Sequence, residues 1–574
     1  MLNLLLSTLA LTRAAAAAGY QWPSPQYDAL EDFLYEGGRP DGSSLGALVS
    51  PCRLRGATNT TVAAEWVRLV YHDAATHQIA DGSGGLDGSI FFETDRTENN
   101  GAGMNNTLND FSVYPSKYVS RADVIVLGTV MAVATCGGPA IPIQGGRIDA
   151  NVAGPYGVPN ITDSLDSLKG TFAHQGFNVS EMIQLVACGH TLGGVRYPDF
   201  PNVVPGSGSQ TVVQLFDDTQ RFDHSIISQY LDGSTRDPLI VANASAASDL
   251  LVFSADNNVT MQSMNSEQAF SSTCSTIFQK MFRTVPSTVN LTDNIDLVPV
   301  KVTGVQLTIG SPELQFQANV RLQLSSNHTT VTMYWCDRYG SGANCASKLK
   351  RFTAPSTSAP VSSPFSATMN LTLQKYQFVV PLAANQSISK FWFEIDYGNG
   401  TTTVANNNGA FYNIDQDAVL FVPSQSRPKA VLSGSNGVFI AAAVKSTNTP
   451  SRVYVDWIGR ATKNFIAVNG TTDLKLNSSI PSVAGYNFYT AEITEEYGAS
   501  MQFDVISVQQ NGTSLADTYK WDTLIGLNTP AETQVNSTTS SAAGGASGAV
   551  AVATAGPWTW SVAAAALAVL SAAL

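Results

Sequence analysis

The chain has 574 residues, and its 44 acidic and 31 basic side chains give a formal net charge of −13. This balance and a sequence pI near 4.9 argue against nucleic acid and against an anionic membrane surface as partners. The length exceeds that of one ordinary hydrophobic core, so we expect several domains.

The amino terminus, MLNLLLSTLALTRAAAAAG, has an apolar run followed by small residues. This pattern is typical of a cleaved secretory signal peptide, which we place at residues 1–18. The chain also contains 15 N-x-S/T sequons with x not proline, from Asn59 to Asn536, and six cysteines. In an exported chain, these features predict N-linked glycans and disulfide bonds on a secreted protein.

Helical periodicity dominates the chain before residue 290. Apolar residues recur at spacings of three and four, which is typical of amphipathic helices. The segments with this pattern are AAEWVRLVYHDAA, ADVIVLGTVMAVATC, SLDSLKGTFAHQGF, SEMIQLVACGHTL and SEQAFSSTCSTIFQKMF. We therefore predict a mainly α domain over residues 19–290.

The segment RLVYHDA places a cation, a tyrosine, a histidine and an aspartate within residues 68–74. On a helix Arg68 and His72 share one face, whereas Asp73 is rotated by roughly 100° from His72. One face could therefore serve a reaction while Asp73 serves a structural ion. In isolation the same pattern more often means solvated charges and a satisfied polar histidine, so partners elsewhere in the chain must decide.

A glycine-rich turn, GGLDGS, follows at residues 84–89 and carries Asp87 and Ser89 on alternate positions. Loops that present oxygen atoms in this way accept hard cations, and Asp73 is the obvious companion. The same residues are also common in ordinary turns. The loop therefore predicts a cation site only together with the helix before it.

A second histidine has oxygen-bearing residues near it in the chain. IQLVACGHTLGG places His190 late in an apolar helix with Thr191 beside it, and FDDTQRFD adds Asp217, Thr219 and Asp223. A single histidine in an apolar helix is more often a core residue than a ligand. The order and pairing of these motifs favour a second oxygen cluster close to His190.

Beyond residue 290 the chain changes to short alternating segments, VKVTGVQLTI, NVRLQLSS, TTVTMYWC, KFWFEIDY and RVYVDWIG. Separated by Gly, Asn, Ser and Pro, such segments are typical of β-sandwich strands. FWFEIDYGNGTTTVANN is loosely similar to FDVISVQQNGTSLADTY. We therefore expect two related β-sandwich domains, at residues 298–424 and 428–527. In the first, Cys336 and Cys345 are the easiest disulfide pair to propose.

The carboxyl-terminal segment is rich in Ser, Thr, Ala and Gly over residues 528–557 and apolar over residues 558–574. The first part cannot build a core. No basic residue follows the apolar part, so we interpret it as the signal for a glycolipid (GPI) anchor, with attachment between Ser541 and Gly545. We expect the protein at the cell surface or cell wall, reaching the membrane only through that anchor.

Residues 45–285 closely resemble the haem peroxidases of the plant-peroxidase superfamily, and most of all the secreted fungal members. RLVYHDA, GGLDGS, ADVIVLGTVMAVATCGGPAIPIQGGRID and ACGHTLGG carry the resemblance. It implies a mainly α haem-peroxidase domain with one haem b and two Ca²⁺ ions. The β-sandwich domains have no counterpart in the family core.

The resemblance also implies roles for individual residues. Arg68 and His72 occupy the positions of the distal pair that acts on peroxide, and His190 that of the proximal ligand of the haem iron. Two further motifs supply support residues, with Glu93 and Asn99 behind the distal histidine in ETDRTEN and the carboxylate of Asp256 behind the proximal histidine in FSAD.

Metal ligands and disulfides follow from the same resemblance. The distal calcium site would comprise Asp73, Asp87, Ser89 and the Gly85 carbonyl, and the proximal site Thr191, Asp217, Thr219 and Asp223. Cys52 and Cys136 fall where the fungal enzymes have a disulfide, which leaves Cys188 and Cys274 as a third pair.

Three positions of the resemblance bear on the haem surroundings. Tyr71 stands where members of the family have Phe or Trp, and we interpret it as a packing residue rather than a redox-active phenol. Phe216 matches the proximal aromatic residue of secreted members, which does not support a tryptophan-radical route. Pro159 matches a residue that lines the access channel of the family.

Other positions argue against specialised donors. Of the three acidic ligands of manganese peroxidases only Glu65 has a counterpart, since Thr61 and Arg196 stand at the other two positions. Leu185 replaces the surface tryptophan of lignin peroxidases. We therefore expect oxidation of small phenols or similar donors at the haem edge.

The predicted function is reduction of hydrogen peroxide with one-electron oxidation of a small aromatic reductant. The alternative is a non-catalytic cell-wall or adhesion protein whose β-sandwich domains bind a cell-wall glycan or another partner. The joint presence of Arg68, His72, Asn99, His190 and Asp256 favours the enzyme, because a degenerate scaffold would be expected to have lost at least one of them.

Overall fold

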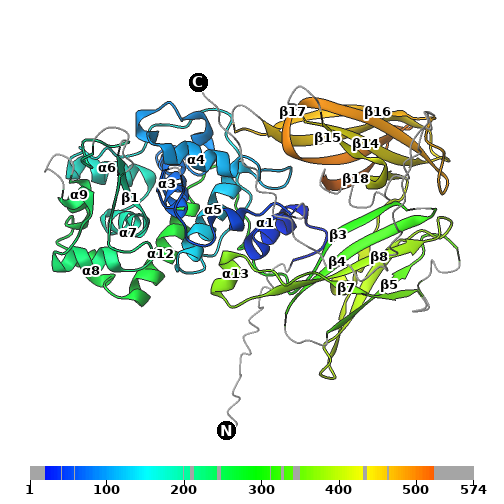
Figure 1. Ribbon diagram of the computed structural model, residues 1–574, viewed down its shortest axis with the longest axis horizontal. Helices are drawn as coiled ribbons and strands as arrows, with labels where there is room; N and C mark the ends of the chain where they lie inside the picture. Colours follow the sequence, from blue (N-terminus) through cyan, green and yellow to red (C-terminus); the bar gives the residue numbers. More distant parts are fainter. Residues whose placement is uncertain are drawn as a thin grey trace, which may run out of the picture. The chain divides into compact units, whose positions relative to one another are not determined.

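The computed structural model describes residues 20–521, apart from residues 40–41, 57, 198, 207–211, 242–246, 311, 325–328, 341–344, 346–349, 431–435 and 462–464. The expected signal peptide, stalk and anchor signal lie outside the described residues. Along the chain the helices, coloured blue to green, precede most of the strands, coloured green to orange (Figure 1). This order confirms a mainly α domain followed by all-β domains.

Twelve α-helices precede the long strands within the described part of the chain. They are α1 (Pro25–Glu36), α2 (Leu45–Val49), α3 (Val62–Ala74), α4 (Ala102–Phe111), α5 (Arg121–Thr135), α6 (Leu165–Gln175), α7 (Val179–His190), α8 (Ser225–Asp232), α9 (Pro238–Val241), α10 (Ser248–Phe253), α11 (Val259–Ser263) and α12 (Glu267–Phe282). Two 3₁₀ turns, η1 (Ser89–Phe92) and η2 (Thr97–Asn99), and a short hairpin of β1 (Gly194–Tyr197) and β2 (Val212–Leu215) lie among them. The five helical segments predicted from periodicity correspond to α3, α5, α6, α7 and α12.

Side-chain caps define where the central helices begin. The Ser120 side chain accepts the N–H of Asp123 at the start of α5. At the start of α7, Asn178 and Glu181 accept each other's backbone N–H groups in a capping box. Each cap satisfies backbone donors that have no partner inside the helix. These contacts hold the starts of α5 and α7.

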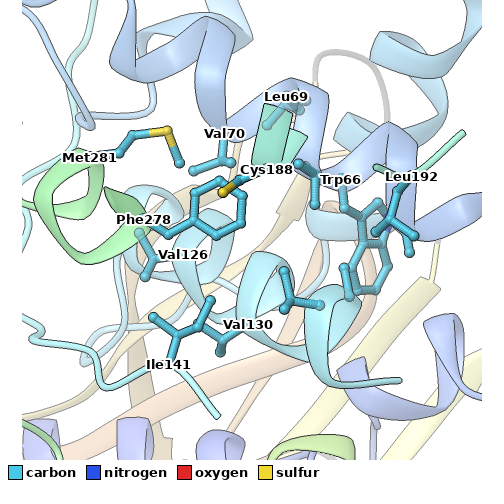
Figure 2. Packing of buried hydrophobic residues seen from close by; sticks show 14 of the residues in the cluster. Trp66, Leu69, Val70, Val126, Val130, Ile141, Cys188, Leu192, Phe278 and Met281 are labelled. Carbon is cyan, nitrogen blue, oxygen red and sulfur yellow. The ribbon is translucent and has the colours of Figure 1, made fainter. Parts of the chain in front are cut away.

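Helix α5 lies at the centre of the helical core. All but one of its residues are buried, which explains why its sequence is apolar on every side. A Cβ on Gly128 would lie 2.3 Å from the ring of Phe111, so glycine allows α4 to pack closely on α5. Figure 2 shows the surrounding side chains, among them Trp66, Leu69 and Val70 of α3, Val126 and Val130 of α5, and Phe278 and Met281 of α12.

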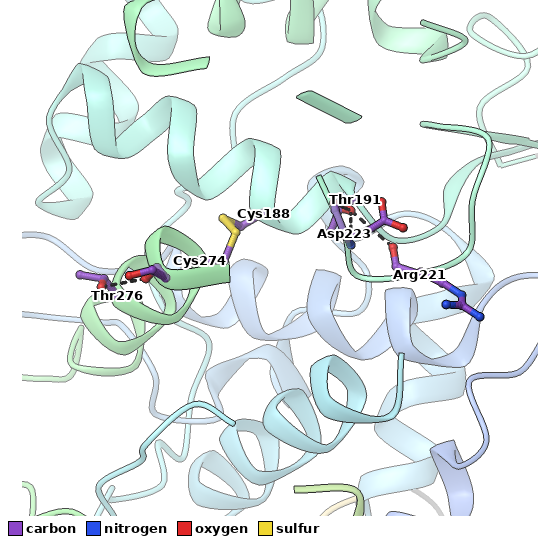
Figure 3. The surroundings of a disulfide bond; sticks show 7 residues. Cys188, Thr191, Arg221, Asp223, Cys274 and Thr276 are labelled. Carbon is purple, nitrogen blue, oxygen red and sulfur yellow. Dashed lines mark hydrogen bonds between the residues drawn. A yellow bond between two sulfur atoms is a disulfide. The ribbon is translucent and has the colours of Figure 1, made fainter. Parts of the chain in front are cut away.

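All six cysteines are paired as predicted. Cys52–Cys136 joins the segment before α3 to the end of α5, and Cys336–Cys345 closes a short loop in the β region. Cys188–Cys274 joins α7 to α12 (Figure 3). The last bond ties the helix that ends at His190 to the core.

The first β domain is a sandwich of two antiparallel sheets. One sheet has the order β3-β4-β8-β7, and the other has the order β10-β9-β5-β6 with β11 beside β9. The strands are β3 (Val300–Ile309), β4 (Leu314–Gln323), β5 (Thr330–Cys336), β6 (Arg351–Thr353), β7 (Ser356–Thr357), β8 (Leu373–Leu382), β9 (Lys390–Asp396), β10 (Thr402–Ala405) and β11 (Tyr412–Asn413). Phe316 and Phe391 meet between the sheets with ring centroids 5.0 Å apart.

The second β domain is one sheet that curls back on itself. It comprises β12 (Val419–Phe421), β13 (Arg427–Ala430), β14 (Asn436–Lys445), β15 (Pro450–Ala461), β16 (Val468–Leu476), β17 (Tyr486–Gln509) and β18 (Ser514–Trp521). The long strand β17 pairs with β14, β15, β16 and β18. The sheet is therefore nearly closed. Two 3₁₀ turns, η5 (Asn407–Gly409) and η6 (Pro423–Gln425), precede β13.

The structure corrects the expected boundary between the two β domains and explains the similarity between two of their segments. Strand β12 pairs with β14, so residues 419–421 belong to the second sheet although the expected boundary lay after residue 424. The two similar segments both form hairpins, β9 with β10 and the end of β17 with β18. Their likeness therefore corresponds to a shared local structure.

The β region contributes to the helical core. Helix α13 (Pro364–Thr368) lies between β7 and β8 in the chain, and its Phe365 joins the core that α3 and α5 build. Ser363 donates its hydroxyl to the carbonyl of Leu34 at 2.6 Å. From β3 and β4, the buried side chains of Lys301 and Arg321 pair with α1, as described below.

Within residues 20–521, leaving aside the gaps given above, no helix has both the length and the apolar character needed to cross a membrane.

Candidate active site

The distal histidine of the prediction lies on α3 and contacts the predicted asparagine. Nδ1 of His72 and Oδ1 of Asn99 are 2.7 Å apart, and Asn99 donates its side-chain amide to the carbonyl of Glu93 at 3.0 Å. Because the amide nitrogen of Asn99 is engaged as a donor, its oxygen accepts a proton from Nδ1 of His72. Nε2 of His72 is then the ring nitrogen with a free lone pair.

The electrostatic surroundings keep His72 neutral. Burial, and secondly the charge of Arg68, lower the pKa of His72 well below its ordinary value near 6.5. An uncharged imidazole can accept a proton at neutral pH. His72 is therefore in the state that a general base requires.

Arg68 lies one helical turn before His72 and contacts two groups. It donates Nη2 to the carbonyl of Asn100 at 2.8 Å, and its guanidinium carbon lies 5.7 Å from the centre of the Phe200 ring. Burial lowers the pKa of Arg68 to about 10, although the charge of Asp199 opposes that effect. Arg68 remains a cation at neutral pH. No sequence signal pointed to Phe200 or Asp199.

Glu93 supports the distal histidine through its backbone carbonyl. Its carboxylate points elsewhere, since Oε1 accepts the N–H of Gly154 at 2.7 Å and Oε2 lies 3.4 Å from Arg96. The residues after α3 are thereby tied to the segment around Gly154. The hydrogen bond from Asn99 then fixes the position of the amide that orients His72.

On the proximal side His190 is the last residue of α7. Its Nδ1 lies 2.6 Å from Oδ2 of Asp249, and its ring stacks on Phe216 with centroids 4.3 Å apart and planes 3° apart. The side chain is nevertheless 33% exposed, which leaves space beside the ring. Within the described part of the chain no hydrogen bond engages Nε2. An imidazole oriented in this way by a carboxylate is a typical metal ligand.

The prediction that Asp256 is the carboxylate behind His190 was wrong. Asp256 accepts the backbone N–H and the hydroxyl of Thr260 at 3.0 and 2.5 Å, so it caps the start of α11. Asp249, in the first turn of α10, is 2% exposed and takes the place behind His190. The residues that follow each aspartate could have identified Asp249. It opens the apolar segment SDLLVF, which is expected to face the core, whereas the polar residues after Asp256 indicate a turn.

The predicted distal oxygen cluster comes together beside α3. Asp73 accepts the N–H groups of Gly88 and Ile90 at 2.9 and 3.1 Å, and Asp87 accepts that of Ser89 at 3.0 Å. Burial, and then repulsion from Asp87, raise the pKa of Asp73 well above its ordinary value. The hydroxyl of Ser89 is buried without a hydrogen-bond partner in the described part of the chain. Two buried carboxyls and an unpartnered hydroxyl offer oxygen ligands of the kind that a hard cation binds.

The second cluster lies just after α7 and before α8. Thr191 donates its hydroxyl to the carbonyl of Asp223 at 2.6 Å (Figure 3), and Oδ1 of Asp217 accepts the N–H of Thr219 at 2.8 Å. Oδ2 of Asp217 is buried, and no described residue donates to it. Burial, with repulsion from Asp223, raises the pKa of Asp217 to about 7. Among the described residues no group of three or more His, Cys, Asp or Glu side chains is arranged to hold a metal ion.

The residues expected to bear on the donor are occupied by other contacts. Tyr71 is partly buried against the helical core and stacks on Phe172, with ring centroids 5.9 Å apart, which agrees with packing. Glu65 pairs with Arg55 at 2.7 Å, and Arg196 pairs with Asp199 at 2.6 Å. Leu185 is buried in α7, Pro159 is half-buried, and Thr61 precedes the first turn of α3.

Comparison with known proteins agrees with this geometry. Residues 52–272 match the model of the family described as Peroxidase. A WSC domain-containing protein of Arthroderma benhamiae is 33% identical over 537 residues, which cover 91% of this chain and 70% of the relative. Putative L-ascorbate peroxidase 6 of Arabidopsis thaliana is 38% identical over 143 residues, and mitochondrial cytochrome c peroxidase of Yarrowia lipolytica is 29% identical over 185 residues.

The helical fold and the two oriented histidines are those of a peroxidase domain. The chain belongs to the family that includes the Arthroderma protein, and its residues 52–272 match the peroxidase family. The two alignments with named peroxidases cover 24% and 31% of this chain, and they span about half of those relatives, 43% and 48% of their lengths. The β region of this chain lies outside the peroxidase match.

Proposed function

We propose that this protein reduces hydrogen peroxide with a haem b held between α3 and α7, and that it oxidises a small aromatic donor by one-electron steps. One observation carries the proposal. Two histidines on contacting helices each have Nδ1 engaged, by Asn99 and by Asp249, and each presents an unengaged Nε2. The match of residues 52–272 to the peroxidase family supports it.

The distal residues move protons and stabilise charge. Nε2 of His72 takes the proton from one oxygen of hydrogen peroxide and returns it to the other, which leaves as water. Arg68, on the same face of α3, stabilises the negative charge that develops on the departing oxygen. Asn99 keeps the proton of the imidazole on Nδ1, so that Nε2 stays basic.

The proximal residues hold the cofactor. Nε2 of His190 would be the protein ligand of the haem iron, and Asp249 orients the ring through Nδ1 and increases its electron donation. When bound, the haem supplies the redox centre at which the oxygen–oxygen bond breaks. Phe216 covers one face of the His190 ring and thereby restricts its rotation.

Small phenols at the haem edge are the proposed donors. A dedicated manganese site has no support, because Glu65 is paired with Arg55 and its expected partners are Thr61 and Arg196. Leu185 offers no redox-active ring at the surface. A panel of phenols, Mn²⁺, ascorbate and cytochrome c, measured as steady-state rates, tests this choice. Faster turnover of Mn²⁺ or cytochrome c than of phenols would refute it.

Two calcium ions are proposed as structural ions. The distal one would bind Asp73, Asp87, Ser89 and the carbonyl of Gly85, and the unpartnered hydroxyl of Ser89 supports it. The proximal one would bind Thr191, Asp217, Thr219 and Asp223, and the unpartnered oxygen of Asp217 supports it. Both clusters adjoin the ends of the helices that bear His72 and His190.

The proposed location is the cell surface, with a GPI anchor. Several sequon asparagines are exposed, which suits N-glycosylation of a secreted chain: Asn160, Asn370, Asn399, Asn469 and Asn511. Deletion from about residue 547 should release active enzyme into the medium, and phosphatidylinositol-specific phospholipase should release part of the full-length form. Retention after the deletion would contradict the anchor.

The direct test of the enzyme is spectroscopic and kinetic. The full chain, expressed with haem, should show a Soret band and should turn over hydrogen peroxide with guaiacol. Absence of the band, or a band without turnover, would leave the second candidate, a non-catalytic wall protein. The β region outside the peroxidase match favours that candidate as a place for binding. Retention of the full chain on cell-wall glycan would then support it.

A further inference from the structure

A buried carboxyl lies close to Asp249, the carboxylate that contacts the proximal histidine. Asp237, the residue before α9, has a fully buried side chain. Its Oδ1 accepts the N–H of Leu239 at 2.8 Å, and no described residue donates a hydrogen bond to Oδ2. Helix α9 packs on α10, which carries Asp249. The group therefore belongs to the surroundings of His190 but has no role in the chemistry described so far.

The neighbours of Asp237 are acidic. The charged groups that act on it most strongly are Asp249, with which it also shares a hydrogen bond, and Asp217. A buried carboxylate beside like charges is costly, so such a group retains its proton. Burial, and then repulsion from Asp249, raise the pKa of Asp237 well above its ordinary value. As a neutral acid, Asp237 has an O–H group to donate.

Asp249 is the neighbouring carboxylate that can accept that O–H group. Its Oδ2 accepts from His190 at 2.6 Å, and its Oδ1 accepts from the Ser248 hydroxyl at a longer 3.3 Å. The Phe216 ring on His190 has no donor to offer. An O–H group of Asp237 would be a further donor to the Asp249 carboxylate.

We propose that Asp237 is a positioning residue that acts on the haem ligand through Asp249: held as a neutral carboxylic acid, it donates a hydrogen bond to the Asp249 carboxylate and draws negative charge away from the imidazole of His190. The inference rests on the proposed ligation of haem by His190. It assigns one chain of hydrogen bonds to Asp237 before α9, Asp249 in α10 and His190 in α7.

The chain sets how strongly His190 donates to iron. A carboxylate that already accepts an O–H group attracts the Nδ1 proton of His190 less strongly, so the imidazole carries less anionic character. Weaker donation disfavours the oxidised iron. Removal of the Asp237 proton donor should therefore make the iron harder to reduce.

The test compares two substitutions in the haem-loaded full chain. Asp237→Leu removes the donor, whereas Asp237→Asn keeps an N–H donor of similar shape. In the Leu variant the equilibrium constant for one-electron reduction should fall on the order of tenfold, and the iron–histidine stretching frequency in resonance Raman spectra should rise. The Asn variant should stay near the wild type in both measurements. Asp256→Asn, which removes a carboxylate that caps α11, should change neither.

A measurement without haem separates this inference from the proposed function. Infrared spectra of the haem-free protein should contain the carbonyl stretch of a protonated carboxyl that shifts in D₂O and is lost in Asp237→Asn. Absence of haem binding with that band present would refute the proposed function alone. The role of Asp237 would be overturned if the infrared spectrum of Asp237→Asn kept every carboxyl band of the wild type. It would also be overturned if Asp237→Leu bound haem with an unchanged reduction potential and Raman frequency.

Discussion

Asn99 accepts a hydrogen bond of 2.7 Å from Nδ1 of His72, so that Nε2 is the basic nitrogen of the distal histidine. The His72→Ala variant should retain haem, because His190 is the proposed ligand. Its reaction with hydrogen peroxide should slow by about 10²–10⁴-fold, since both proton transfers lose their carrier. Stopped-flow mixing measures this rate. His174→Ala, which removes an exposed histidine on α6, is the matched control. Equal rates in the two variants would contradict the assignment.

The pH dependence of the same step follows from the lowered pKa of His72. The neutral form reacts, and burial and Arg68 both favour it. The rate constant should therefore stay level as pH falls through 6.5 and should drop only well below that value. In Arg68→Leu the nearby positive charge is gone, so the pKa of His72 rises and the drop should move to higher pH. A profile with the same midpoint in both proteins would show that Arg68 does not act on His72.

The proximal carboxylates can be told apart by paired variants. Asp249→Asn removes the charge beside Nδ1 of His190 and should lower haem affinity or peroxidase activity by about 10–100-fold. Asp256→Asn weakens the cap of α11 and should lower the free energy of unfolding by about 0.5–2 kcal/mol, with an unchanged haem spectrum. Haem titration and thermal unfolding measure the two effects. The reverse pattern would restore Asp256 as the partner of His190.

The distal calcium ion should hold the catalytic helix in place. In Asp73→Ala, or after chelation, α3 loses the contacts that Asp73 makes on a different face from Arg68 and His72, and His72 can move towards the iron. The high-spin ferric spectrum should become a low-spin spectrum of bis-histidine type, and activity should fall in parallel. Added Ca²⁺ should restore the chelated wild type but not Asp73→Ala. If the chelated protein had lost its calcium and still showed normal turnover, the prediction would be contradicted. Asp73 would then serve only as an acceptor of structural hydrogen bonds.

The contact between α1 and the first β domain should be essential for stability. The ammonium group of Lys301 lies 2.7 Å from the carboxylates of both Glu31 and Asp32, and Lys301 and Glu31 are fully buried. Lys301→Met leaves these carboxylates with less compensation and should cost about 3–5 kcal/mol in the free energy of unfolding. Arg452→Met breaks the exposed pair with Asp473 and should cost about 0–1 kcal/mol. Equal losses in denaturant unfolding would disprove a special role for the buried pair.

Local patterns predicted the elements that carry the distal site. Apolar spacing located α3, and the separation of four residues placed Arg68 and His72 on one face of it. Alternation located β3, whose bounds Val300–Ile309 coincide with the predicted segment. Such patterns succeed because each helix or strand buries a face that its own sequence defines.

Contacts between segments that are distant in the sequence could not be predicted from local patterns. The choice between Asp249 and Asp256 depends on how α10 packs on α7. The apolar residues after Asp249 indicate that this aspartate lies near the core, but they do not indicate that it contacts His190. Pairing of β12 with β14 joins strands across a boundary that composition alone suggested. Lys301 lies in a strand of alternating pattern, and its charge predicts a solvent-exposed side chain. Its neighbours in the sequence give no indication that it pairs with Glu31.

The pairing of Arg321 with Glu31 spans 290 positions of the chain. At a synthesis rate of about 5–20 residues per second, α1 leaves the ribosome about 15–60 s before its cationic partners. During that interval the acidic residues of α1 must stay hydrated, and the surface of the helical core that α13 later covers stays open. The helical domain is therefore incomplete until the β region has been made. Haem insertion that requires a complete core would follow translation rather than accompany it.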